Sequence, residues 1–288
     1  MVLGDEMKKI LTVLLLIFAM GCGRKEIYIP VEYEKPDINM LVSFPYLSCG
    51  RSMIAELPSG ETLLIDCGGS DDFPVLYDTL RQMEMTRLDY IVLTSYDEDK
   101  GNALKKISAN MEIGDIYISR MSDGIEELKG ICKSNSYPDS CLYLVSEGTR
   151  LYDSGKVSID VVYSGQCETK IGISSVISLY ICCDDVGIFY EGDGDYVAER
   201  EIASTMNNLI KSDVIVVPHC GADYLPSDEI ITAVNPKYAV IPVYGDVYPM
   251  DDTLKRLKNS GCEILRTDYD GEISLVTDGK EVDVYKER

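Results

Sequence analysis

The feature that most constrains the fold is a strand–helix–strand pattern that occurs twice in the chain. The first copy has an apolar run at 62–65, apolar residues at helical spacing over 73–83, and a second apolar run at 90–93. The second copy has the same order at 187–190, 196–210 and 214–217. The pattern predicts two units in which a helix connects two buried strands.

Aspartates mark equivalent positions in the two copies. Asp66 follows the first apolar run of one copy, and Asp193 lies just beyond that of the other, 127 residues later. Asp89 and Asp213 precede the second runs and lie 124 residues apart. This near-equal spacing indicates one domain of two similar halves, each a sheet covered by helices. Two unrelated strand–helix–strand units would give the same pattern, so that alternative stays open.

Polar loops follow the buried strands of both copies. Residues 96–99 follow the strand at 90–93, and residues 218–221 follow the strand at 214–217. Side chains at the carboxyl ends of such strands converge, so we expect them to line one cleft. Further expected elements are a hairpin over 52–65, a strand at 111–118, a helix at 125–132, strands at 157–162 and 175–182, a helix at 250–260, and a closing hairpin that turns at 268–271 before a strand at 273–277.

The amino-terminal segment has the pattern of a secretory signal. Lys8 and Lys9 precede an apolar run at 10–20, which is too short to span a bilayer comfortably. The run ends at Gly21 and Cys22, which resembles the cleavage box of a bacterial lipoprotein, whose cysteine is acylated. An ordinary signal with an incidental cysteine is the alternative.

The domain organisation follows from this interpretation. We expect residues 1–21 to be a signal peptide, Cys22 to be lipidated, residues 22–37 to form a tether, and residues 38–288 to form the folded domain. A lipid anchor would hold the protein on the extracytoplasmic face of a bacterial cell membrane. The membrane is therefore the one partner that the sequence indicates.

The charge balance excludes some partners and sites. The chain has 27 lysines and arginines against 49 aspartates and glutamates, a net charge of −22. A surface this negative repels phosphate backbones, so we expect no nucleic-acid partner. The only histidine is His219, which excludes the common zinc-hydrolase sites built from two or more imidazoles.

Nine cysteines follow Cys22, and export would permit disulfide bonds among them. Their odd number and irregular spacing do not give a disulfide framework. Cys132 and Cys141 flank a loop rich in Ser, Asn and Pro, and they are the pair to test first. Cys182 and Cys183 are neighbours in a predicted strand, so they should point to opposite faces and not pair.

Six short segments occur in an order typical of one known family. They are 60–68, 93–101, 190–193, 217–221, 248–249 before a predicted helix, and 266–271. Together they resemble the metallo-β-lactamase superfamily, and more narrowly the extracytoplasmic hydrolase domain of ComEC-type competence proteins, over about residues 38–284. The resemblance implies an α/β (α+β) fold, a four-layer αββα sandwich from two similar halves, with metals held by loops at one edge of the sheets.

The resemblance also assigns the family's metal-site positions. Those that keep an acidic or imidazole side chain are Asp97, Asp99, Asp193 (the bridging carboxylate) and His219. Those where this chain departs from a family histidine are Ser95, Lys100, Cys220 and Tyr248.

These departures decide what the site can hold. A hydrolytic zinc site needs three or four N, S or O ligands and a position for water. Three carboxylates and one imidazole instead suit a harder ion such as manganese, calcium or magnesium. An ammonium among the carboxylates neutralises the charge that a metal ion would cancel. We therefore expect either no cofactor or one divalent ion (Mn, Zn, Mg or Ca), and hypothesise that Lys100 replaces a lost cation, which metal analysis tests.

Two functions are compatible with this sequence. The first is an exported lipoprotein with an eroded metal site that works as a non-catalytic binding or scaffold protein. The alternative is a metal-dependent hydrolase, phosphodiesterase-like, that uses a single non-zinc or weakly held ion.

Overall fold

The computed structural model describes residues 39–134, 141–169, 172–206, 209–222 and 224–288. The predicted signal peptide, Cys22 and the predicted tether all lie outside the described residues. Within the described part of the chain, no helix has both the length and the hydrophobicity needed to cross a bilayer.

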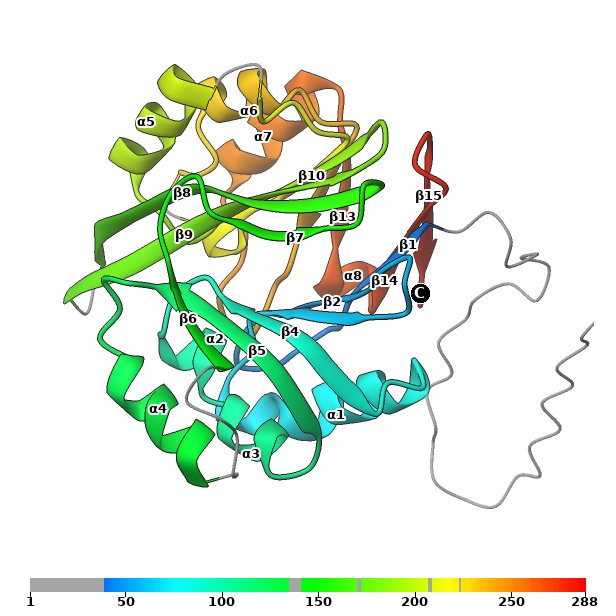
Figure 1. The fold of residues 1–288 in the computed structure, drawn as a ribbon. Helices are drawn as coiled ribbons and strands as arrows, with labels where there is room; N and C mark the ends of the chain where they lie inside the picture. Colours follow the sequence, from blue (N-terminus) through cyan, green and yellow to red (C-terminus); the bar gives the residue numbers. More distant parts are fainter. Residues whose placement is uncertain (1–38, 135–140, 170–171, 207–208, 223) are drawn as a thin grey trace, which may run out of the picture.

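Two β-sheets lie face to face in the middle of the molecule (Figure 1). The first has eight strands in the order β15-β14-β1-β2-β3-β4-β5-β6, and the second has seven in the order β13-β12-β11-β10-β9-β8-β7. The strands of the first sheet are β1 (Met40–Phe44), β2 (Met53–Glu56), β3 (Thr62–Ile65), β4 (Arg87–Leu93), β5 (Glu112–Ser119), β6 (Leu142–Val145), β14 (Ile273–Thr277) and β15 (Val282–Lys286). Those of the second are β7 (Arg150–Asp153), β8 (Val157–Thr169), β9 (Gly172–Cys183), β10 (Val186–Tyr190), β11 (Val214–Val216), β12 (Tyr238–Ile241) and β13 (Glu263–Arg266).

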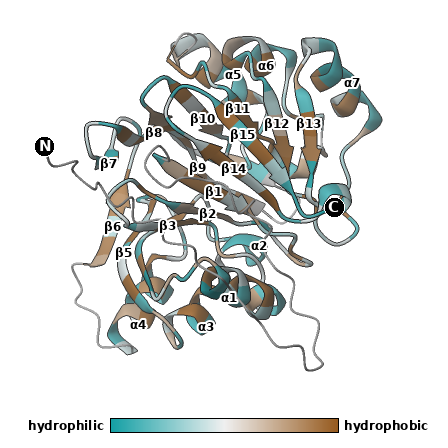
Figure 2. Cartoon of the chain, turned by 90° about the vertical axis from the view of Figure 1, so that its right-hand side faces the viewer, coloured by the Kyte–Doolittle hydropathy of each residue, from teal (hydrophilic) through white to brown (hydrophobic). Residues whose placement is uncertain are grey.

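Helices cover the outer face of each sheet (Figures 1 and 2). Below the first sheet lie α1 (Phe73–Gln82), α2 (Glu98–Gly101), α3 (Leu104–Ser108) and α4 (Ile125–Ser134). Above the second lie α5 (Tyr196–Met206), α6 (Asp228–Val234) and α7 (Asp251–Ser260). The short turns are η2 (Ser70–Asp72), η4 (Pro218–Gly221) and α8 (Thr267–Asp270).

The apolar core has three parts, one between each pair of layers. Residues such as Leu179 pack between the two sheets. Residues such as Leu104 pack between the first sheet and its helices, and residues such as Ile230 do the same for the second sheet. Burial of these three apolar layers is the main source of stability. The arrangement confirms the predicted four-layer αββα sandwich.

The predicted duplication is also present. In the first half, β3 and β4 are parallel, with Leu63 opposite Tyr90, and α1 connects them. In the second half, β10 and β11 are parallel, with Ile188 opposite Val214, and α5 connects them. The strands of both units therefore end at the same side of their sheets, where the polar loops follow.

Two sequence predictions are wrong, one about strand pairing and one about the end of a helix. The expected closing hairpin around 268–271 does not exist, because β13 pairs with β12 in the second sheet whereas β14 pairs with β1 in the first. The intervening α8 carries the chain from one sheet to the other, and the closing hairpin is formed by β14 and β15. The helix expected over 196–210 is shorter, since α5 ends at Met206 and residues 209–210 are not helical.

Candidate functional site

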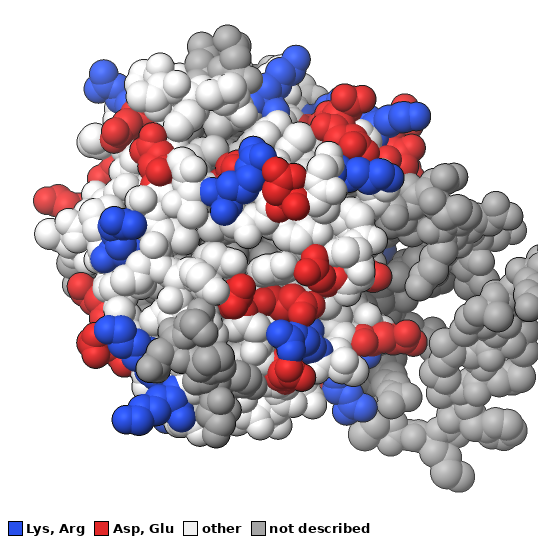
Figure 3. Space-filling model, viewed as in Figure 1, with Lys and Arg blue, Asp and Glu red and all other residues white. Residues whose placement is uncertain are grey.

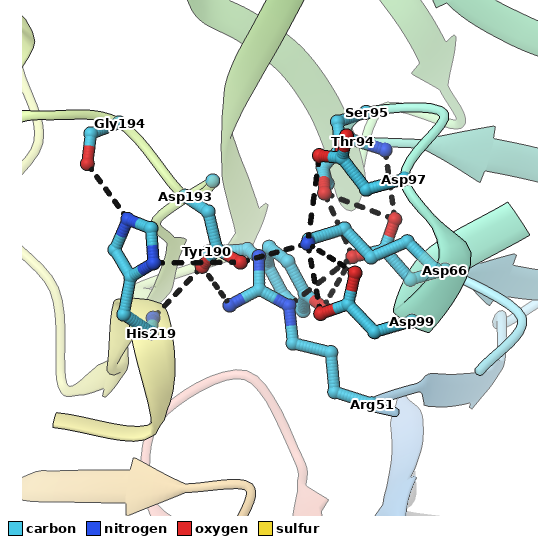
Figure 4. A network of polar contacts seen from close by, with 12 residues as sticks. Arg51, Asp66, Thr94, Ser95, Asp97, Asp99, Tyr190, Asp193, Gly194 and His219 are labelled. Carbon is cyan, nitrogen blue, oxygen red and sulfur yellow. Dashed lines mark hydrogen bonds and ion pairs between the residues drawn. The ribbon is translucent and has the colours of Figure 1, made fainter. Parts of the chain in front are cut away.

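Loops at one edge of the two sheets bring the predicted site residues together (Figure 4). The loop after β4 carries Asp97 and leads into α2, which carries Asp99. Asp193 follows β10, and His219 lies in η4 after β11. Both halves therefore contribute to one cluster, as the convergence of the strand ends predicts.

The carboxylate of Asp193 pairs with two buried cations from the first half. Nη1 of Arg51 lies 2.6 Å from Oδ1 of Asp193, and Nζ of Lys100 lies 2.8 Å from Oδ2. The same ammonium lies 2.9 Å from Oδ1 of Asp99 and 3.9 Å from Oδ2 of Asp97. Arg51 is 1% exposed and Lys100 2%, so carboxylates rather than water compensate these charges. Asp193 thus bridges two protein cations, one on each oxygen.

Neighbouring charges keep these groups ionised although they are buried. Burial alone would raise the pKa of Asp193, but Arg51, Lys100 and His219 bring it well below its usual range. Burial alone would lower the pKa of Lys100, but Asp193 and Asp99 raise it above its ordinary value. Both shifts favour the charged form. The contact between Lys100 and Asp193 is therefore an ion pair at neutral pH.

Tyrosines of the second half donate hydrogen bonds to carboxylates of the first. The hydroxyl of Tyr190 donates to Oδ2 of Asp66 at 3.0 Å. The main-chain N–H and the hydroxyl of Thr94 also donate to the Asp66 carboxylate, at 2.8 and 2.7 Å. The hydroxyl of Tyr244 donates to Oδ2 of Asp99 at 2.6 Å. Hydrogen bonds and ion pairs therefore connect the two halves at this edge.

Asp97 is held mainly by hydroxyl groups. Oγ of Ser95 donates to its Oδ2 at 2.6 Å, and Oγ of Ser174 in β9 donates to the same oxygen at 2.9 Å. Ser95 stands where the family resemblance places a histidine. In this chain its side chain acts as a hydrogen-bond donor to a carboxylate.

His219 and Cys220 form an unusual turn after β11. Their φ angles are 48° and 55°, and Gly221 follows at 75°. This left-handed region is unfavourable for residues with a Cβ atom. The main-chain N–H of His219 donates to Oδ1 of Asp193 at 2.8 Å, which stabilises the turn. Nε2 of His219 lies 3.0 Å from the carbonyl oxygen of Gly194 and therefore carries the hydrogen. Nδ1 lies 4.0 Å from Oδ2 of Asp193.

The two remaining altered positions supply no metal-binding nitrogen. Cys220 is buried, and burial raises the pKa of its thiol to about 12, so the sulfur is protonated at neutral pH. Tyr248 is 53% exposed in the loop before α7.

Known proteins resemble this chain in fold but not detectably in sequence. The sequence matches no protein-family model and no curated protein. Solved structures match over most of the chain. The metallo-β-lactamase fold protein YhfI from Bacillus subtilis is 14% identical, with a TM-score of 0.56 over 79% of this chain and 96% of that one. This chain has a metallo-β-lactamase fold.

Two further structures share the metallo-β-lactamase fold of this chain at similar levels. A diphosphatase of the PhnP family is 11% identical, with a TM-score of 0.52 over 83% of this chain and 98% of that one. CmlA, a diiron β-hydroxylase from Streptomyces venezuelae, is 15% identical, with a TM-score of 0.52 over 81% of this chain. The match covers 53% of CmlA, so this chain corresponds to about half of it. These similarities concern the fold.

The residues at this edge of the metallo-β-lactamase fold do not fit a metal ion. The Lys100 ammonium lies between oxygens of Asp99 and Asp193 and pairs with both. Arg51 pairs with the other oxygen of Asp193. In the described ranges, no three His, Cys, Asp or Glu side chains are placed to hold a metal ion together. A metal ion would have to displace Lys100 to reach the bridging carboxylate.

Sequence reasoning missed Arg51, Tyr190 and Tyr244, and also the hydroxyl donors Thr94 and Ser174, as members of this polar cluster. One signal for Arg51 was present, because it is a single basic residue two positions before the strand β2. The two tyrosines end β10 and follow β12, positions where aromatic side chains usually contribute to packing.

Replacing Tyr190 with phenylalanine is expected to lower the free energy of unfolding by about 1–3 kcal/mol, because the buried Asp66 carboxylate loses a donor. Urea denaturation followed by circular dichroism measures this. The control is Tyr143→Phe, which removes a hydroxyl from a side chain that is 43% exposed. Equal effects of the two substitutions would show that the Tyr190 hydroxyl has no special role.

Proposed function

We propose that this chain is an exported lipoprotein whose metallo-β-lactamase fold carries an eroded metal site, and that it acts as a non-catalytic binding or scaffold protein. One observation carries the proposal: both oxygens of Asp193 pair with cations of the chain itself, Arg51 and Lys100. The proposed lipid anchor rests on the sequence pattern around Cys22.

The chemistry of these cations supports a non-catalytic role. A catalytic metal ion polarises its substrate and activates a bound water through open coordination positions. An ammonium or guanidinium supplies hydrogen bonds and charge but has no coordination position for water. Here both are buried and compensated by carboxylates. We propose that the cluster now connects the two halves of the domain.

The proposed location is the extracytoplasmic face of a bacterial membrane, as for the ComEC-type domain that the sequence resembles. Binding of nucleic acid is not part of the proposal, because the net charge is −22. On the face shown in Figure 3, the basic side chains of the described residues are interspersed with acidic ones. This distribution does not favour the binding of a polyanion such as a nucleic acid.

A hydrolase is the second candidate. The observation in its favour is that Asp97, Asp99, Asp193 and His219 do lie together at the edge where the fold places its loops. The PhnP-family diphosphatase with the same fold makes phosphoesters the first substrates to try. This function would require a metal ion to displace Lys100.

An activity screen separates the two candidates. The full chain is assayed with chromogenic phosphodiester, phosphomonoester and β-lactam substrates, with manganese or zinc added. The proposal predicts no turnover above that of the buffer with the same metal. Turnover that Asp99→Ala abolishes, and that the exposed-site control Glu126→Ala leaves unchanged, would establish the hydrolase instead.

A further inference from the structure

Two cysteines outside the candidate site lie together between the first sheet and its helices. Cys132 is in the last turn of α4, and Cys141 directly precedes the edge strand β6. Their sulfur atoms are 2.8 Å apart, and the two residues are nine positions apart in the sequence. Both belong to the apolar core between the first sheet and its helices, with 1% and 4% exposure.

This sulfur–sulfur distance is too short for an ordinary contact between unbonded atoms, which lie about 3.5–4.0 Å apart even for carbon. A disulfide bond needs a further approach to about 2.05 Å. The folded structure therefore already brings the two sulfur atoms of Cys132 and Cys141 close to bonding distance. We propose that Cys132 and Cys141 are a covalent modification site, at which an intramolecular disulfide forms.

Three other cysteines, Cys49, Cys182 and Cys262, have different surroundings. Cys49 is exposed and contacts the hydroxyl of Ser48. The thiols of Cys182 and Cys262 donate to main-chain carbonyl oxygens, those of Asp184 and Leu257. The contact between two sulfur atoms thus distinguishes Cys132 and Cys141 from these three.

The reaction is a thiol–disulfide exchange with an external disulfide, such as oxidised glutathione or the disulfide of an oxidoreductase. One cysteine thiolate attacks the external disulfide, forms a mixed disulfide and releases one thiolate. The second cysteine then displaces the other thiolate. Two thiols of this chain lose two electrons and two protons in total, and the external disulfide is reduced to two thiols.

The timing of the reaction follows from the surroundings of Cys141. Both residues are almost fully buried, so an external disulfide has little access to either sulfur in the folded protein, and burial with the neighbouring Cys132 raises the pKa of the Cys141 thiol to about 12. Because the thiolate is the nucleophile, oxidation of the folded, reduced protein is slow. The bond is therefore expected to form while the chain folds in the presence of the oxidant.

The bond would connect the end of α4 to the start of β6. β6 is an edge strand that pairs only with β5 in the first sheet, so it has fewer hydrogen-bonded neighbours than the inner strands. A crosslink across a short loop stabilises a fold by restricting the unfolded chain. The effect is independent of the Asp193 cluster, so either proposal can fail without the other.

The test uses the full chain refolded with oxidised glutathione. The protein is unfolded in guanidinium, its free thiols are blocked with N-ethylmaleimide, and its peptides are analysed by mass spectrometry. The proposal predicts that Cys132 and Cys141 are recovered as one crosslinked, unblocked pair, and that prior reduction makes both react. Recovery of both residues as blocked thiols, or joined to other cysteines, would overturn the proposal.

A stability measurement gives a second readout. Reductant is expected to lower the melting temperature of the oxidised wild type by about 5–10 °C. The double variant C132S/C141S should show no such response, whereas the control C262S should respond like the wild type. A reductant effect that persists in C132S/C141S would assign the stabilisation to other cysteines and contradict the proposal.

Discussion

Replacing Asp193 with alanine is expected to lower the free energy of unfolding by about 3–5 kcal/mol, which corresponds to a fall of about 10 °C in melting temperature. The substitution removes the nearer of two carboxylates that pair with Arg51, leaving Asp66 at 3.4 Å, and removes one partner of Lys100. Both cations then remain buried without full compensation, and the His219 turn loses its acceptor. Uncompensated burial of charge is among the largest effects that a single substitution can have.

Urea denaturation followed by circular dichroism measures this loss. The control is Glu126→Ala, which breaks the exposed pair with Lys129 and should cost no more than about 0.5 kcal/mol. If Asp193→Ala does not fold, Asp193→Asn keeps the volume and an acceptor for the His219 N–H while removing the charge. An Asn variant within the range of the control would show that the two cations do not depend on this carboxylate.

Replacing Lys100 with alanine is expected to destabilise the protein and to make it respond to divalent cations. The ammonium lies between oxygens of Asp99 and Asp193, and its removal leaves two carboxylates without that cation. Manganese suits such oxygen ligands, and a ligand that binds only the folded state raises its stability. At a concentration about 100 times its dissociation constant, it would contribute about 2.7 kcal/mol.

Thermal unfolding of wild type and Lys100→Ala with and without manganese tests this expectation. The melting temperature should rise with manganese in the variant and stay unchanged in the wild type. Lys106→Ala is the control, because Lys106 is exposed and donates to the carbonyl oxygen of Ser70 outside the cluster. An equal response of wild type and Lys100→Ala would mean that the ammonium does not stand in a cation's place.

The sequence predicts much of the fold because apolar periodicity reflects burial directly. The units β3–α1–β4 and β10–α5–β11 follow from alternating buried runs and helical spacing, which do not depend on distant contacts. The turn at 268–271 shows why topology is harder. Its Asp and Gly residues predict that the chain turns, but not that the next strand joins the other sheet.

For the candidate site, too, local features are predictable from the sequence and contacts between distant segments are not. Lys100 is identified from its position beside Asp99 in one short segment, since neighbours in sequence remain neighbours in the fold. Arg51 is not, because its nearest carboxylate, Asp193, lies in the other half and the two meet only when both sheets have assembled. Tyr190 and Tyr244 are missed for the same reason, since each donates to a carboxylate of the first half.

Metal analysis of the wild-type protein tests the central claim most directly. The full chain is purified without chelator, incubated with manganese and zinc, desalted and measured by inductively coupled plasma mass spectrometry. Because Arg51 and Lys100 already pair with both oxygens of Asp193, we predict no stoichiometric metal. One equivalent of metal per chain that Asp193→Asn abolishes would contradict the claim that protein cations occupy this site.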